Sequence, residues 1–291
     1  MPGFAMATNT KKAARAGAFG LLAVCALSGF SCHDASRGPE QVDPAAFSWN
    51  APISAPKTVF VRNTNGSVEV KPSTDGNVRV TAEVRWRSGD PKKDLKFETS
   101  NDGAGVTICA IWGTGTCSAS GYASTSRSAK DRFLGHGTDA SVTFVVYVPT
   151  GVKVDAYTSN GSIGVAATAP VFARSANGTI KVATSVGPVD AETINGDVDI
   201  RMTTLGADGP VRAHSVNGTV NAYLPETFNG SLEISTVLGE TSSDFAGPTK
   251  KDGEKTLSGT IGTGGRTVEL GTVTGSASVH KLGADGKPLA P

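Results

Sequence analysis

One twelve-residue pattern occurs seven times in this chain, and it constrains the fold more than any other feature. In each copy an aliphatic residue begins a stretch of alternating residues, a turn ending in Gly follows, and the alternation resumes. The copies are Val59–Val70, Val154–Val165, Val171–Val182, Val189–Ile200, Val211–Ala222, Leu232–Ser243 and Val268–Val279. A single copy would bury too little surface to be stable alone. We therefore expect the copies to stack into a continuous core.

The turns are compatible with two architectures. Five copies place Asn before the turn glycine: Asn65-Gly66, Asn160-Gly161, Asn177-Gly178, Asn195-Gly196 and Asn217-Gly218. Asn-Gly favours a type I′ turn, so each copy could be a β-hairpin in an antiparallel meander. Alternatively, each copy is one coil of a β-solenoid, with Asn-Gly at a corner.

Two observations favour the solenoid. A second turn motif, a small residue followed by Pro, recurs before the strands, at Ala169-Pro170, Gly187-Pro188 and Gly209-Pro210. This favours a solenoid because a closed coil needs a second corner. Matched positions also hold like residues, which would allow Asn side chains to form a ladder along the axis. The sequence thus predicts an all-β solenoid with coils of about 17–22 residues. The final interval between turn glycines is longer and indicates a degenerate copy near Gly259.

Residues that alternate without the turn motif follow the first copy. Segments 78–86, 95–99, 106–112 and 140–148 predict an irregular antiparallel strand segment. A Gly/Ser/Thr-rich insertion, residues 113–138, separates the last two of these segments. Long insertions of this kind are often functional.

The repeat Asn-Gly-[Ser/Thr/Asp]-[Ile/Val], the strands after the first copy and Val148-Pro149 before the second resemble the bacterial "putative adhesin" domain family. The resemblance covers about residues 57–281. It implies an exported protein with a right-handed β-helical body. It supplies no catalytic residues.

The N-terminal region resembles an export signal. Lys11, Lys12 and Arg15 precede an apolar stretch, residues 16–27, which is too short for a comfortable membrane span. We expect a signal peptide over residues 1–31. Ser31-Cys32 partly resembles a lipoprotein processing site, so Cys32 is either lipidated or left after ordinary cleavage. Residues 32–56 are expected to be a flexible tether, and residues 282–291 a tail.

The remaining cysteines bear on the oxidation state. Cys25 lies in the expected signal, and lipidation of Cys32 would leave Cys109 and Cys117 as the only pair. Export favours a disulfide between them. A metal site is the alternative, but His136 alone nearby does not complete a ligand set.

No residue constellation in the sequence indicates catalysis. The chain has 27 basic and 26 acidic residues and no basic stripe, which argues against nucleic-acid binding. The acidic residues Asp190, Glu192, Asp197 and Asp199 fall within one repeat, and they predict either a cation or sugar site or an ordinary solvated face.

In the repeats, Val171, Ala173, Val189, Ala191, Val211 and Ala213 should be buried, whereas Asp190, Glu192 and Arg212 should be exposed.

Three function classes remain. The favoured one is a non-enzymatic cell-envelope protein whose solenoid presents a surface for binding or scaffolding, without a cofactor. Its partner would be an envelope or extracellular protein or glycan, and a lipid anchor would attach it to a membrane. The alternatives are a carbohydrate-active enzyme on a β-helix and a self-assembling envelope filament, which would need uncapped terminal coils.

Overall fold

The computed structural model describes residues 39–123, 138–167, 169–204, 209–250 and 253–283. The expected signal peptide, Cys32 and part of the insertion, residues 124–137 with His136, lie outside the described residues. Residues Pro39–Pro291 form one compact unit. In the described part of this unit, strands predominate, and the single helix is the short α1 (Pro91–Asp94).

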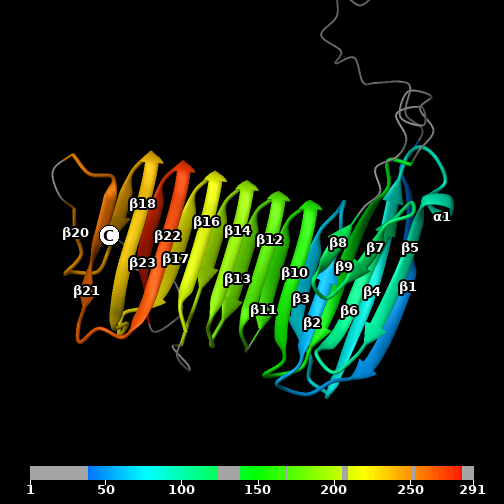
Figure 1. Cartoon of the computed structure of the whole chain (residues 1–291), viewed down its shortest axis with the longest axis horizontal. Coiled ribbons are helices and arrows are strands. Elements are labelled where there is room, and N and C mark those ends of the chain that lie inside the picture. Colours follow the sequence, from blue (N-terminus) through cyan, green and yellow to red (C-terminus); the bar gives the residue numbers. More distant parts are fainter. Residues whose placement is uncertain (1–38, 124–137, 168, 205–208, 251–252, 284–291) are drawn as a thin grey trace, which may run out of the picture. The chain divides into compact units, whose positions relative to one another are not determined.

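Two large sheets form the body (Figure 1). Sheet A contains, in spatial order, β1 (Gln41–Pro52), β4 (Asn77–Trp86), β9 (Ser141–Val148), β3 (Val68–Pro72), β11 (Ile163–Ala167), β13 (Ile180–Thr184), β15 (Val198–Arg201), β17 (Val220–Pro225), β23 (Ala277–Leu282) and β19 (Thr241–Ser243). Sheet B contains, from the same end, β5 (Leu95–Asn101), β6 (Gly105–Trp112), β2 (Thr58–Arg62), β10 (Lys153–Asn160), β12 (Val171–Asn177), β14 (Val189–Asn195), β16 (Val211–Asn217), β22 (Arg266–Thr274), β18 (Gly230–Leu238), β21 (Thr256–Ile261) and β20 (Thr249–Lys250).

Each repeat copy contributes one strand to sheet B and, after the corner glycine, one strand to sheet A. Equivalent strands pair in parallel and in register, as Val171 with Val189 and Val189 with Val211. A hairpin meander would pair the two halves of one copy antiparallel, so that alternative is excluded. The chain is a β-solenoid, which confirms the predicted fold class.

The core fills the space between the two sheets. Val171, Ala173, Val189, Ala191, Val211 and Ala213 are all buried, as predicted from the alternation. Glu192 and Arg212 are exposed, but Asp190 is half-buried. Asp190 departs from the prediction because its carboxylate lies under Arg174, whose Nη2 is 3.3 Å from Oδ2.

The two ends of the solenoid do not follow chain order. At one end, β6 and β9 form a coil outside the one formed by β2 and β3, although β2 and β3 come earlier in the sequence. At the other end, β22 and β23 lie between β16–β17 and β18–β19 (Figure 1). The segments expected as an irregular antiparallel region therefore include one full coil, split by the insertion.

Antiparallel strands close both ends. On the N-terminal side β4 pairs with β9, β1 with β4, and β5 with β6. On the other side β21 pairs antiparallel with β18, and β20 with β21. The predicted degenerate copy near Gly259 is therefore wrong: Gly259 lies in β21, where the chain runs back along β18 instead of making another coil.

The expected tether is also wrong for residues 41–52, which form β1. This strand pairs with β4 from Gln41 opposite Trp86 to Pro52 opposite Asn77. Phe47 and Trp49 pack against the core, and the Phe47 ring stacks on Phe97 with centroids 4.9 Å apart. These aromatic side chains make burial of the segment favourable, so the fold begins well before residue 57.

Candidate functional site

The predicted turn residues lie at one corner of successive coils. Their amides form a ladder along the axis: Asn177 Nδ2 donates to Asn160 Oδ1 (2.9 Å), Asn195 Nδ2 to Asn177 Oδ1 (2.8 Å), and Asn217 Nδ2 to Asn195 Oδ1 (2.9 Å). Asn65 departs from this pattern and donates to the carbonyl oxygen of Ala140 at 2.7 Å.

The corner glycines stack closely on one another. A Cβ on Gly178 would lie 2.0 Å from the carbonyl oxygen of Gly161, and one on Gly218 would lie 1.9 Å from that of Gly196. Gly161, Gly178, Gly196 and Gly218 have φ between 149° and 157°. Glycine is therefore required at this corner for close approach between coils, and not for a hairpin turn.

A buried ladder of hydroxyls supports the same corner. Thr158, Ser175, Thr193 and Ser215 each donate to the carbonyl oxygen of the glycine in the preceding coil, at 2.8–3.0 Å. Thr272 and Thr236 continue the ladder to Gly218 and Gly275. The sequence analysis did not assign this role to these hydroxyl residues. The corner residues thus have a structural role, because their polar groups form hydrogen bonds within the fold.

The start of the insertion is held on sheet B. Residues Thr116–Ser118 (β7) and Gly121–Ala123 (β8) of the insertion form a short antiparallel hairpin. Cys109 on β6 and Cys117 on β7 are joined by a disulfide, with Cα atoms 6.3 Å apart. The buried Arg62 adds a second anchor, since Nη2 donates to the Ala119 carbonyl (2.6 Å) and Nη1 pairs with Asp155 Oδ1 (2.8 Å).

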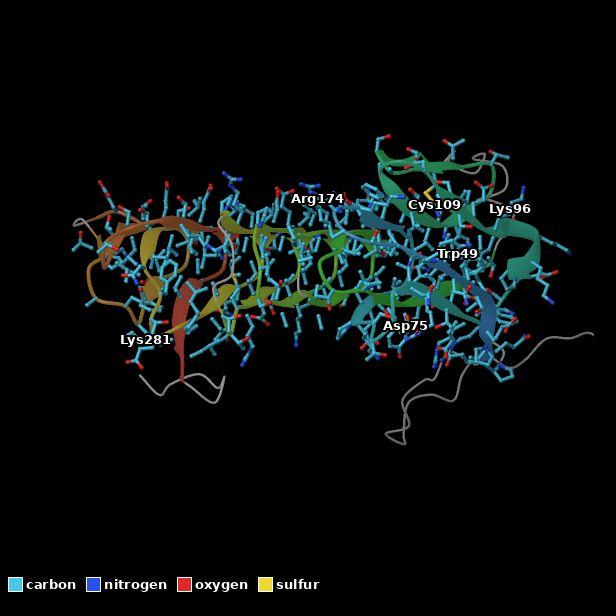
Figure 2. The ribbon with its side chains drawn as sticks, turned by 90° about the horizontal axis from the view of Figure 1, so that it is seen from below. Trp49, Asp75, Lys96, Cys109, Arg174 and Lys281 are labelled. Atoms are coloured by element: carbon cyan, nitrogen blue, oxygen red, sulfur yellow. A yellow bond between two sulfur atoms is a disulfide. The ribbon has the colours of Figure 1, made fainter. Side chains whose placement is uncertain are left out.

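The acidic residues of the repeat copy Val189–Ile200 do not converge. Asp190 and Glu192 lie on the outer face of sheet B, where Arg174 bridges them (3.3 and 3.0 Å). Asp197 lies at the corner, and Asp199 lies on sheet A. Figure 2 places Arg174 on the sheet B side of the body and Lys281, of β23, on the sheet A side. The alternative of a cation or sugar site built from all four carboxylates is therefore wrong.

The outer face of sheet A contains a groove of about 430 Å³, which we call the sheet A groove. It is lined by Glu69, Val70 and Lys71 of β3, Gly164, Val165 and Ala166 of β11, Lys181, Val182 and Ala183 of β13, Asp199 and Arg201 of β15, and Tyr223 of β17. This volume lies within the usual range for ligand sites, about 300–1,000 Å³. Small side chains at outward positions of β11 and β13 make the hollow.

Charged side chains bound the groove on both sides. Lys71 forms one wall and is paired with Glu69 at 3.1 Å. Arg201 forms the opposite wall, and its guanidinium carbon lies 5.0 Å from the centre of the Tyr223 ring. Tyr223 also stacks on His280, with ring centroids 5.1 Å apart. The Arg201 side chain is therefore braced by two successive rings along the sheet.

The polar groups of the groove have distinct environments. Asp199 Oδ1 accepts a hydrogen bond from Asn221 Nδ2 at 3.0 Å. Burial and the nearby Asp199 carboxylate raise the pKa of the Tyr223 hydroxyl, so it stays protonated at neutral pH and can donate a hydrogen bond. Lys181 is exposed and rises from the middle of the groove.

Sequence reasoning missed this groove because its residues come from five strands. Gly164, Ala166 and Ala183 at outward positions were the available signal, since most outward positions hold larger polar residues. Only the register brings them beside one another: Ala166 is opposite Ala183, which is opposite Arg201. Arg201 in turn is opposite Tyr223.

Residues 163–280 match the family model described as Toastrack DUF4097. The matched residues run from β11 to β23 and include most of the repeat copies. The match confirms the family resemblance seen in the repeats. No curated protein matches the chain in sequence.

Two solved structures resemble the chain distantly. A putative cell adhesion protein from Clostridium sporogenes has 10% identity and a TM-score of 0.46, covering 83% of this chain and 98% of its own. A putative adhesin from Bacteroides fragilis has 10% identity and a TM-score of 0.32, covering 81% and 98%. TM-scores this low carry no argument about function. In the described residues, no helix is long and apolar enough to cross a membrane.

Proposed function

We propose that this protein is a non-enzymatic, adhesin-like component of the cell envelope, which binds an extracellular ligand through the outer face of sheet A. The observation that carries the proposal is the sheet A groove, a hollow on an otherwise regular solenoid face that is lined by three basic residues, Lys71, Lys181 and Arg201, and two acidic ones, Glu69 and Asp199. The residues around it belong to strands paired on both sides, so the surface is preformed and rigid.

The spacing of the groove carboxylates argues against glycoside hydrolysis. Glu69 lies on β3 and Asp199 on β15, three strand spacings apart in sheet A. Neighbouring strands lie about 4.8 Å apart, which puts the two positions about 14 Å from each other. The paired carboxylates of glycosidases lie about 5–9.5 Å apart. This geometry favours binding over the alternative of a carbohydrate-active enzyme.

The capped ends argue against the alternative of a self-assembling filament. In the described residues, the outermost strands at one end are β19 and β20, which have three and two residues. At the other end the outermost strands are β1 and β5. β1 contains Pro44 and Pro52, and Pro lacks the N–H needed for a further ladder, while β5 exposes the charged Lys96 and Glu98, which oppose pairing with another strand. Short edges and edge prolines both oppose strand addition.

The envelope location is supported by the N-terminal sequence. Basic residues followed by a short apolar stretch are typical of export signals. Lipidation of Cys32 would anchor the solenoid at a membrane, and ordinary cleavage would release it outside the cytoplasm. The Cys109–Cys117 disulfide suits an oxidising compartment.

The test is capture from an envelope extract by the purified full chain after processing. An Ala183→Trp variant would fill the groove at an outward position, and Val216→Trp at the exposed corner of sheet B is its matched control. We expect envelope material to be retained by the wild type and the control but lost with Ala183→Trp. Equal retention by both variants would exclude the groove as the binding surface.

A further inference from the structure

We propose that the sheet A groove binds an acidic oligosaccharide, one that carries carboxylates on its sugar rings. This inference rests on the proposed function and specifies its ligand. It follows from the arrangement of the basic side chains, from the hydrogen bonding of the strands beneath them and from the width of the groove between Lys71 and Arg201.

Two basic side chains lie on opposite sides of the groove, and the residues between them are small; we call these small residues the floor. Lys71 lies on β3 and Arg201 on β15, with Gly164, Ala166 and Ala183 between them. The two walls are three strand spacings apart, about 14 Å. Lys181 projects from β13 within this interval. A ligand lying along the solenoid axis would therefore meet cationic groups at both ends and in the middle.

Arg201 is prepared to bind a carboxylate. Its guanidinium stacks on Tyr223, which is itself stacked on His280, so the side chain loses little further freedom on binding. A planar guanidinium matches a carboxylate with two parallel hydrogen bonds. Stacked arginine is thus a better carboxylate receptor than a freely rotating one, because less entropy is lost.

Lys181 strengthens the preference for an anion. Among the residues that the structure describes, it has no ion-pair partner, whereas Lys71 is paired with Glu69. Its neighbours in the row across the sheet are Gly164 on one side and Asp199 on the other. Asp199 also accepts a hydrogen bond from Asn221. A ligand carboxylate over the floor would provide Lys181 with a direct counter-ion.

The backbone beneath the groove favours a saccharide over a peptide. Strands β3, β11, β13 and β15 are paired on both sides within sheet A, so their N–H and C=O groups are already used in the ladder. Extended peptides are commonly recognised by adding a strand to an open sheet edge, which this face does not offer. Recognition must come from side chains, which suits a ligand with hydroxyls and carboxylates around its rings.

The experiment measures calorimetric binding of the full chain to four probes. These are tetragalacturonate, its fully methyl-esterified form, a neutral dextran oligomer and a tetraglutamate peptide. We expect tetragalacturonate to bind with an affinity that falls as salt is raised, and the ester and dextran not to bind. Equal binding of tetraglutamate would overturn the saccharide assignment and indicate charge recognition alone.

Variants locate the binding. Lys181→Gln and Arg201→Gln should each weaken tetragalacturonate binding about tenfold or more, since each removes a charge-assisted hydrogen bond. Lys96→Gln, on β5 of sheet B, removes the same charge from another face and is the control (Figure 2). An equal loss in the control, with melting temperatures unchanged, would overturn the site.

The outcomes separate this inference from the proposed function. If tetragalacturonate does not bind, but envelope capture is still abolished by Ala183→Trp, the ligand class is wrong and the binding function stands. If Ala183→Trp keeps both capture and tetragalacturonate binding, the groove is not the binding site and both proposals fail.

Discussion

Thr193 donates a hydrogen bond to the carbonyl oxygen of Gly178 in the neighbouring coil, at 3.0 Å. Thr193 is buried, and the same contact recurs from coil to coil along the solenoid. This contact joins the two residues on which the corner depends. The glycine permits close approach of neighbouring coils, and the hydroxyl donates a hydrogen bond to the glycine carbonyl oxygen.

Replacing Thr193 with Val should therefore destabilise the protein. Valine keeps the shape but leaves the Gly178 carbonyl without its hydroxyl donor, at a cost of about 1–3 kcal/mol. Urea unfolding followed by circular dichroism measures the loss, and Thr193→Ser, which keeps the hydroxyl, is the control. Equal stability of the Val and wild-type proteins would show that water replaces the hydroxyl.

Gly178→Ala should be more damaging. The new Cβ would lie 2.0 Å from the Gly161 carbonyl oxygen, so two coils would have to move apart. We expect a loss on the order of 3 kcal/mol in the free energy of unfolding. Gly103→Ala has open space around the added Cβ and should be nearly neutral. A small effect at both positions would contradict the close stacking of the coils.

Asp190→Asn tests the charges on sheet B by their pH dependence. Burial is the largest cause that raises the pKa of Asp190, and Glu192 adds to it, while Arg174, Arg212 and His214 lower it. A carboxyl with a raised folded-state pKa holds its proton more tightly in the folded state. Its unfavourable contribution is absent below the unfolded pKa of about 4 and appears as pH rises through the folded pKa.

The Asn variant should consequently gain stability over the wild type at pH 7 and lose that advantage at pH 3. Urea midpoints at the two pH values measure the change. Glu233→Gln, an exposed carboxyl on β18, serves as the control and should show a smaller pH-dependent difference. A variant less stable than the wild type at pH 7 would mean that the ion pair with Arg174 outweighs burial.

Cys109 and Cys117 should be found oxidised in protein isolated from outside the cytoplasm. A disulfide that closes a loop of this length stabilises the folded protein by about 2–3 kcal/mol, because it restricts the conformations of the unfolded chain. Alkylation without reductant followed by mass spectrometry reads the pairing, and the Cys109→Ala/Cys117→Ala double variant should melt at a lower temperature. Quantitative alkylation of both thiols in the unreduced protein would refute the bond.

Cys32→Ser tests the membrane anchor. Acyl chains contribute about 0.8 kcal/mol per buried CH₂, so a multiply acylated Cys32 would hold the protein in the membrane fraction. We expect the wild type in that fraction and the Ser variant in the soluble extracytoplasmic fraction. If both fractionate as soluble, lipidation is wrong while export stands. Folded protein in the cytoplasm with residues 1–31 intact would end the envelope proposal.

The sequence alone determined the coil and its core. Val171, Ala173, Val189 and Ala191 repeat at fixed offsets, and that alternation assigns which side of each strand is buried. The Asn-Gly position predicted a corner whose amides could stack, and the Asn160–Asn177 contact follows that expectation. These features are local, since they depend on the spacing of residues within one copy.

Tertiary structure decided the order of the terminal coils and the location of the groove. Each coil presents nearly the same backbone edge to its neighbours, so the repeat pattern does not specify that β22 lies between β16 and β18. The docking of β1 depends on aromatic contacts such as Phe47 with Phe97, which are distant in sequence. The groove joins Lys71 to Arg201 across four strands, and that proximity exists only once parallel register has set them in a row.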